Sequence, residues 1–142
     1  MELRQKRRII ATLVFCLMLC YSLALPVMGA SNYFTGMTGK MNSLSGTPSG
    51  QWSIPSGSVL GQSPGVTEVT VNLTTSTGSS PFYLYVRNPA GETYYQSVGI
   101  RTTQVTFPDF DGDHPAGNWT VWIQSQGLVT TTSARMRVDY TY

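Results

Sequence analysis

Three aspartates at alternate positions are the residues whose spacing most directly suggests chemistry. Asp109, Asp111 and Asp113 lie in one loop with Gly112. Carboxylates in such a loop can converge on a hard cation such as Ca²⁺, which takes six to eight oxygen ligands. The loop is not an EF-hand, because His114 stands at the sixth position where that motif needs glycine. Asp and Gly also favour plain turns, so a calcium site at the three aspartates and a solvated connecting loop are both open readings.

Catalytic chemistry has little support in the sequence. His114 is the only histidine, and no nucleophile elbow accompanies the abundant Ser and Asp residues. A hydrolase needs a nucleophile and a base oriented by a third group. Zinc is also disfavoured, because Cys16 and Cys20 are the only cysteines and both lie near the N-terminus. We therefore predict that the protein is not an enzyme and has no catalytic residues.

A second group of candidate residues is aromatic. Trp119, Val121 and Ile123 alternate with polar residues in the segment 118–124. Successive side chains of a strand point to opposite faces, so an inward Trp119 places Trp122 on the outer face. We expect Trp122 to be exposed there.

The same alternation puts more aromatic rings outside. Tyr83 and Tyr85 face away from the apolar residues of the segment 82–87, and Arg87 and Gln124 flank the rings. We predict a ligand-binding surface of Trp122, Tyr83, Tyr85, Arg87 and Gln124, which suits a sugar ring or a protein contact. In the alternative interpretation the rings only satisfy strand propensity or lie under the N-terminal segment.

The elements that position these residues are strands. From Val66 onward the apolar residues recur with period two, and no window shows a helical stripe. Turn-forming residues separate the segments, as in Asn88-Pro89-Ala90-Gly91. Six to eight short strands in about a hundred residues predict an all-β fold, a single jelly-roll-like β-sandwich.

Residues 31–57 differ from the rest. Eighteen of the thirty-five residues 31–65 are Gly, Ser or Pro, which disfavours helices and long strands. We expect a loosely held N-terminal arm over residues 31–57, an edge strand near Ser58–Leu60, and a β-sandwich domain over residues 58–142.

The N-terminus has the order of a signal peptide. Basic residues at 4–8 precede the uncharged apolar run Ile9–Leu25, and Pro26 and the small residues Gly29 and Ala30 follow. We predict cleavage within a residue or two of Ser31. Retention as a membrane anchor is the alternative, because the run approaches the length of a bilayer span.

The predicted mature chain bears on location and partners. It has no cysteine, and its five Lys and Arg against six Asp and Glu give a net charge of −1. We expect a protein secreted by, or on the surface of, a Gram-positive bacterium. The absence of basic clusters argues against nucleic acid as a partner.

Turn and tryptophan placement carry a family resemblance. The segments 67–73, 82–91 and 110–121, with Asn88-Pro89-Ala90-Gly91 and Gly117-Asn118-Trp119-Thr120-Val121, resemble the P-domain of proprotein convertases and subtilisin-type proteases over about residues 60–142. The resemblance implies a jelly-roll β-sandwich that is a non-catalytic accessory module, sometimes calcium-binding. This chain departs from the family by standing without a protease domain.

Taken together, the sequence predicts a secreted, non-catalytic β-sandwich module that binds an extracellular polysaccharide or protein partner, with Ca²⁺ as the one candidate cofactor. The alternative function is a structural component of an envelope or matrix. That component would assemble with itself through Thr-rich strands such as Leu128–Ala134.

Overall fold

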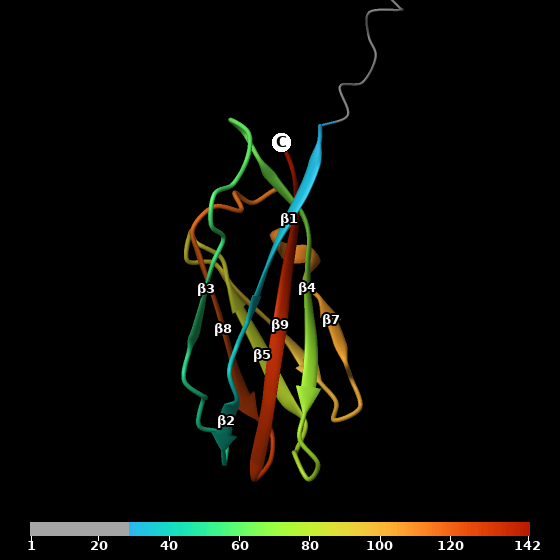
Figure 1. Cartoon of the computed structure of the whole chain (residues 1–142). Helices are drawn as coiled ribbons and strands as arrows, with labels where there is room; N and C mark the ends of the chain where they lie inside the picture. The colour runs from blue at the N-terminus through green and yellow to red at the C-terminus, as the bar shows by residue number, and fades with distance from the viewer. Residues whose placement is uncertain (1–28) are drawn as a thin grey trace, which may run out of the picture.

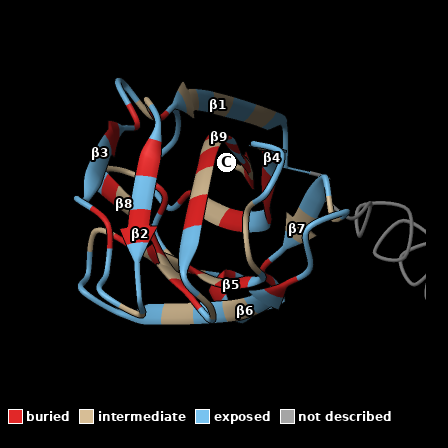
Figure 2. Ribbon diagram, turned by 90° about the horizontal axis from the view of Figure 1, so that it is seen from below, coloured by how far each residue is buried: buried red, intermediate tan, exposed pale blue. Residues whose placement is uncertain are grey.

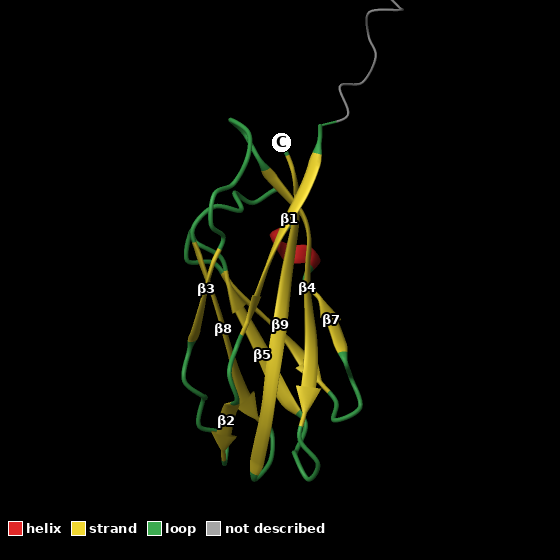
Figure 3. Cartoon of the chain, in the orientation of Figure 1, coloured by secondary structure: helices red, strands yellow, loops and turns green. Residues whose placement is uncertain are grey.

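The computed structural model describes residues 29–142, and nearly all the regular secondary structure in this part of the chain is strand (Figure 1). The predicted signal peptide, apart from Gly29 and Ala30, lies outside the described residues. The strands are β1 (Ser31–Met37), β2 (Met41–Leu44), β3 (Trp52–Pro55), β4 (Gly65–Thr75), β5 (Phe82–Arg87), β6 (Thr93–Val98), β7 (Gln104–Thr106), β8 (Asn118–Ser125) and β9 (Val129–Thr141). One short 3-10 helix, η1 (Pro108–Phe110), precedes β8 (Figure 3). Within the described residues no helix is long and apolar enough to cross a membrane.

The strands form two antiparallel sheets. One has the order β1-β9-β4-β7, with β2 also paired to β9, and the other has the order β3-β8-β5-β6. The pairs are nested along the chain: β2 with β9, β3 with β8, β4 with β7, and β5 with β6. This nesting is a long hairpin rolled into two layers, which is the topology of a jelly roll. The predicted all-β sandwich is therefore confirmed.

The period-two pattern explains the core. Inward residues of both sheets pack into one apolar cluster in which Phe82, Leu84, Trp119, Val121 and Ile123 are fully buried. Figure 2 shows buried and exposed residues alternating along the strands. The prediction that the Trp119 side chain points into the core is confirmed. Its indole N–H donates to the carbonyl oxygen of Pro115 at 2.9 Å, so the buried polar atom has a partner.

The expectation of a loosely held arm over residues 31–57 is wrong. β1 pairs with β9 along its whole length, from Ser31 opposite Thr141 to Met37 opposite Arg135. A Cβ on Gly36 would lie 2.2 Å from Ile54 Cγ2 of β3, so this glycine allows β1 to close against β3. No strand forms at residues 58–60, and the edge strand of that region is β3. Gly36 and Gly39 of this region therefore serve close packing, against Ile54 and Trp52.

The segment Leu128–Ala134 is not an open edge. Most of it lies in β9, which pairs with β2 on one side and with β4 on the other. Residues 129–132 pair with β2 and residues 132–134 with β4, and the carbonyl oxygens of Val129 and Thr131 accept hydrogen bonds from Ser80 and Ser76. The structure therefore gives this segment no open edge for assembly, while the alternative function as a self-assembling structural component stays a prediction.

Candidate functional site

The outer face of the β3-β8-β5-β6 sheet carries a row of aromatic side chains. Tyr85 of β5 stands directly opposite Trp122 of β8 on one side and directly opposite Tyr95 of β6 on the other. Tyr83 lies two residues away on β5, on the same face. The sheet register thus brings together residues that lie up to 39 positions apart in the chain, and places four rings on adjoining strands.

The rings contact one another. The Tyr85 and Trp122 centroids are 5.2 Å apart with planes at 4°, which is a stacked pair. Tyr85 and Tyr95 are 5.4 Å apart at 35°, and Tyr83 meets Tyr95 edge-on at 5.5 Å. Because neighbouring strands lie about 4.8 Å apart, rings on adjacent strands come within contact distance along the row. We call Tyr83, Tyr85, Tyr95 and Trp122 the aromatic row.

Trp122 differs from the expectation in one respect. It points to the outer face, as the alternation predicts, but only 9% of it is exposed. The Tyr85 ring stacks on it, and the Arg87 guanidinium carbon lies 4.9 Å from its ring centroid. The prediction of an exposed Trp122 is therefore wrong. Trp122 therefore packs against Tyr85 and Arg87, and a ligand would contact these two side chains before Trp122.

Gln124 and Tyr85 are held by polar contacts. The Tyr85 hydroxyl donates to Gln124 Oε1 at 3.1 Å, and Gln124 Nε2 donates to the carbonyl oxygen of Gly46 at 2.7 Å. Gly46 lies in the turn after β2, with φ of 78°, where glycine carries no Cβ penalty. This chain of contacts fixes the Tyr85 ring before any ligand arrives.

Arg87 lies against the row at Trp122. Besides the Trp122 ring, its guanidinium reaches Gln51 Oε1 at 3.5 Å. The five residues predicted from the sequence do lie together on one face. Two contributors, Tyr95 and Gln51, were missed by the sequence reasoning.

Tyr95 is the ring of this row that reaches solvent most, with 60% exposed. It was missed because Tyr94 and Tyr95 are adjacent, so the pattern alone does not say which ring faces inward. The structure turns Tyr94 inward, 5.0 Å from Phe110. The pairing of Tyr95 with Tyr85 could have been predicted from the turn 88–91, since turn length sets hairpin register.

β6 is an open edge strand. It pairs with β5 alone, as Figure 2 shows at the margin of the molecule. The Asn88 N–H donates to the Glu92 carbonyl oxygen at 3.0 Å. Hydrogen-bonded and non-hydrogen-bonded pairs alternate along an antiparallel ladder. Counting from the hydrogen-bonded pair of Asn88 and Glu92, the residues Thr93, Tyr95 and Ser97 fall in non-hydrogen-bonded pairs with β5. Their N–H and C=O groups therefore point away from β5, toward the open edge.

Hydrogen bonds join the acidic loop to the turn between β5 and β6. Asp113 Oδ2 accepts a hydrogen bond from Asn88 Nδ2 at 2.7 Å, and the same nitrogen donates to Glu92 Oε2 at 2.9 Å. Asp109 and Asp111 are exposed. Within residues 29–142, no three His, Cys, Asp or Glu side chains form a group that could hold a metal. Calcium binding at Asp109, Asp111 and Asp113 stays a prediction, while the contacts of Asp113 join the loop to the β5–β6 turn.

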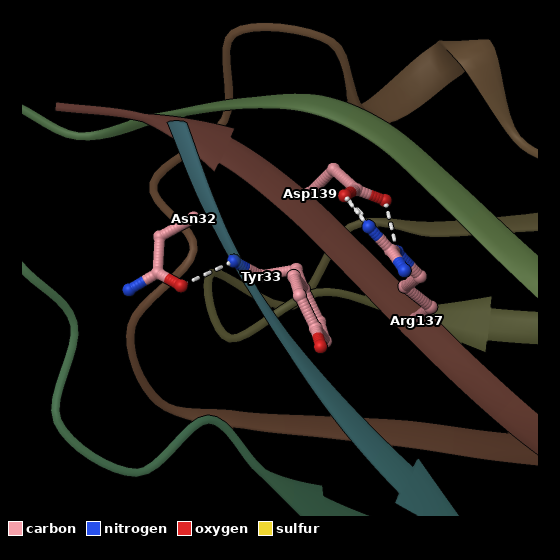
Figure 4. A network of polar contacts seen from close by, with 4 residues as sticks. All are labelled: Asn32, Tyr33, Arg137 and Asp139. Carbon is pink, nitrogen blue, oxygen red and sulfur yellow. Dashed lines mark hydrogen bonds and ion pairs between the residues drawn. The ribbon is translucent and has the colours of Figure 1, made fainter. Parts of the chain in front are cut away.

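The opposite face of the sandwich also carries an exposed tyrosine. Tyr33 of β1 is 53% exposed, and its ring centroid lies 3.9 Å from the Arg137 guanidinium carbon. Figure 4 shows Arg137 also paired with Asp139. The distance from Arg137 Nη2 to Asp139 Oδ1 is 2.6 Å. The hydrogen bonds that Arg137 donates to the Asp139 carboxylate raise the pKa of Arg137 above its ordinary value. Tyr33 therefore offers a natural comparison for Tyr95, with similar exposure on the other sheet.

Comparisons with known proteins support the fold and no more. No family model matches the chain, and no curated protein matches it. A solved structure described as the crystal structure of FlhE is similar with a TM-score of 0.51 and 12% identity, covering 82% of this chain and 100% of that one. A solved structure described as the structure of Tomato Aspermy Virus has a TM-score of 0.48 and 11% identity, covering 92% of this chain and 94% of that one. The resemblance to the P-domain family stays a prediction.

Proposed function

We propose that this protein is a secreted, non-catalytic binding module that takes its extracellular ligand at the tyrosine end of the aromatic row. The observation that carries the proposal is Tyr95, a ring with 60% exposure on an open edge strand. Tyr83 and Tyr85 adjoin it, and each is partly exposed. Tyrosines lose little conformational entropy on binding and combine apolar area with a polar hydroxyl, which is why interfaces are rich in them.

Preorganisation supports the same end of the row. Trp122 and Gln124 hold Tyr85 from two sides, so binding there would order few additional side chains. Rigid contact groups lower the entropic cost of association. The protein would therefore bind without reshaping its sheet.

The stacked geometry bears on the class of ligand. A sugar ring stacks on a free aromatic face, but the two faces of Tyr85 have Trp122 and Tyr95 as neighbours. The row therefore offers ring edges, hydroxyl groups and the side of Tyr95 nearest the open edge. That surface favours a protein or peptide partner over a sugar stacked on several rings.

The test compares two exposed tyrosines. Wild-type protein, Tyr95→Ala and Tyr33→Ala are sedimented with isolated Gram-positive cell walls, before and after the walls are stripped of protein. We expect Tyr95→Ala to weaken binding about tenfold or more, which is about 1.4 kcal/mol, and Tyr33→Ala to bind as wild type. Loss of binding to stripped walls would identify a protein ligand, and retained binding a polysaccharide. Equal binding by the two variants would refute the proposed site.

A further inference from the structure

The open edge of β6 lacks the features by which edge strands avoid pairing. Proteins blunt such edges with proline, charge, bulges or short length. β6 has six residues with no proline, no charge and no register shift. By contrast, β3 contains Pro55 and β7 has three residues. On the remaining side, β1 packs against β3 through Gly36 and Ile54. Apart from this contact at Gly36, β1 likewise has no proline, charge or register shift. β6 differs from β1 because it carries the most exposed ring of the aromatic row, Tyr95.

The edge is also complementary to itself. The outward-facing positions Thr93, Tyr95 and Ser97 are symmetric about Tyr95, with a hydroxyl residue on each side. An antiparallel copy centred there would place Tyr95 opposite Tyr95, and Thr93 opposite Ser97. Each of the three positions brings one N–H and one C=O to the pairing, and no like charges meet.

From this we infer that two copies of the chain associate through β6, with Tyr95 on the two-fold axis. The two four-stranded sheets then join into one sheet of eight strands. The aromatic row continues across the axis, because Tyr95 of one copy lies beside Tyr95 of the other, and the most exposed ring of the row gains a partner. This inference does not rest on the proposed function, since the pairing needs no ligand.

The size of the contact predicts its strength. A single pair of six-residue strands covers less than the roughly 1,600 Å² of a standard interface. The association should therefore be weak and concentration-dependent. In sedimentation velocity between about 5 and 500 μM, without ligand, we expect the weight-average mass to rise toward twice the monomer mass. Tyr95→Lys should stay monomeric, because two lysines would meet at the axis, and Tyr33→Lys on the other sheet should associate as wild type.

Disulfide cross-linking tests the register of the inferred β6–β6 pairing directly. The predicted exported form has no cysteine. In the inferred pairing, position 93 of one copy lies opposite position 97 of the other as a hydrogen-bonded pair, with Cα atoms about 5.5 Å apart. That distance suits a disulfide. Both positions are exposed, so the substitutions should leave the fold intact, and Tyr95 stays in place.

Under mild oxidation, a mixture of Thr93→Cys and Ser97→Cys should give a disulfide-linked heterodimer, while each variant alone should link far less. A strictly monomeric wild type, together with a mixture that links no better than the single variants, would overturn the inference and leave β6 to a strand of another protein. Linkage of Thr93→Cys to itself would overturn the Tyr95-centred register.

Discussion

The indole ring of Trp122 lies parallel to the phenol ring of Tyr85, with centroids 5.2 Å apart and planes 4° apart. The two residues are directly opposed on β8 and β5. Directly opposed side chains are the unit by which sheets are stabilised, and aromatic pairs contribute beyond their buried area. This pair is therefore a structural support for the exposed tyrosines beside it.

The first prediction concerns Trp122. Trp122→Ala should lower the free energy of unfolding by about 1.5–3 kcal/mol, because a large side chain that is 9% exposed loses its burial. Trp122→Phe should recover much of the loss by keeping a ring against Tyr85. Urea unfolding followed by circular dichroism measures both. An alanine variant as stable as wild type would show that the ring adds nothing to the sheet.

A second prediction concerns Trp119, which is fully buried and touches Phe110 at 5.1 Å between centroids. Trp119→Ala should cost about 3–5 kcal/mol, as a large-to-small change in a core. The loss should exceed that of Trp122→Ala in the same unfolding experiment. The reverse order would contradict the inward and outward assignments of the two indoles.

The contact of β1 with β3 gives a third prediction. Gly36→Ala adds a Cβ that would meet Ile54 Cγ2, and overpacking of this kind costs about 1–3 kcal/mol. Adding Ile54→Ala to Gly36→Ala should cost less than Ile54→Ala does in the wild-type background, because in the Gly36→Ala background the loss of the Ile54 side chain also removes the clash. Strict additivity in the double-mutant cycle would contradict the contact and favour a detached N-terminal segment.

The Asn88 side chain supplies a fourth prediction. Asn88 is 2% exposed and donates to both Asp113 and Glu92. Hydrogen bonds to charged groups contribute about 1.5–3 kcal/mol each, so Asn88→Ala should be clearly destabilising. Asp109→Asn, at an exposed position, should change stability by less than about 0.5 kcal/mol.

Calcium separates the two interpretations of the acidic loop. If the role of Asp113 is its bond with Asn88, the loss in Asn88→Ala and Asp113→Ala should be the same with millimolar calcium and with chelator. A calcium-dependent rise in the melting temperature that Asp111→Asn removes would instead establish the metal site.

Much of the fold follows from the sequence because one face of nearly every strand is buried. Val69, Val71 and Leu73 alternate with polar residues, and a one-residue slip would expose all of them. The pattern therefore predicts both strands and facing, including those of Trp119 and Trp122. Alternation does not predict β1, because the sequence of this strand has no apolar periodicity. The strand is held instead by its pairing with β9 and by the close contact at Gly36.

The site was only partly predictable for a related reason. Alternation gives the face of a residue but not how deeply its neighbours cover it. Trp122 is covered by Tyr85 and Arg87, and these contacts depend on which strands are adjacent. Tyr95 belongs to the site only because β6 lies beside β5. The order of strands in a sheet depends on the whole chain, so it cannot be predicted from the spacing of residues within one segment.

The most direct test of the proposed binding site compares Tyr95 and Tyr33 within one molecule. In dilute protein the two rings, 60% and 53% exposed, should be nitrated by tetranitromethane to comparable extents. With an excess of Gram-positive cell walls, peptide mass spectrometry should show Tyr95 protected and Tyr33 still modified. Binding to the walls with Tyr95 nitrated as in the free protein, or with Tyr33 protected instead, would contradict the site proposed here.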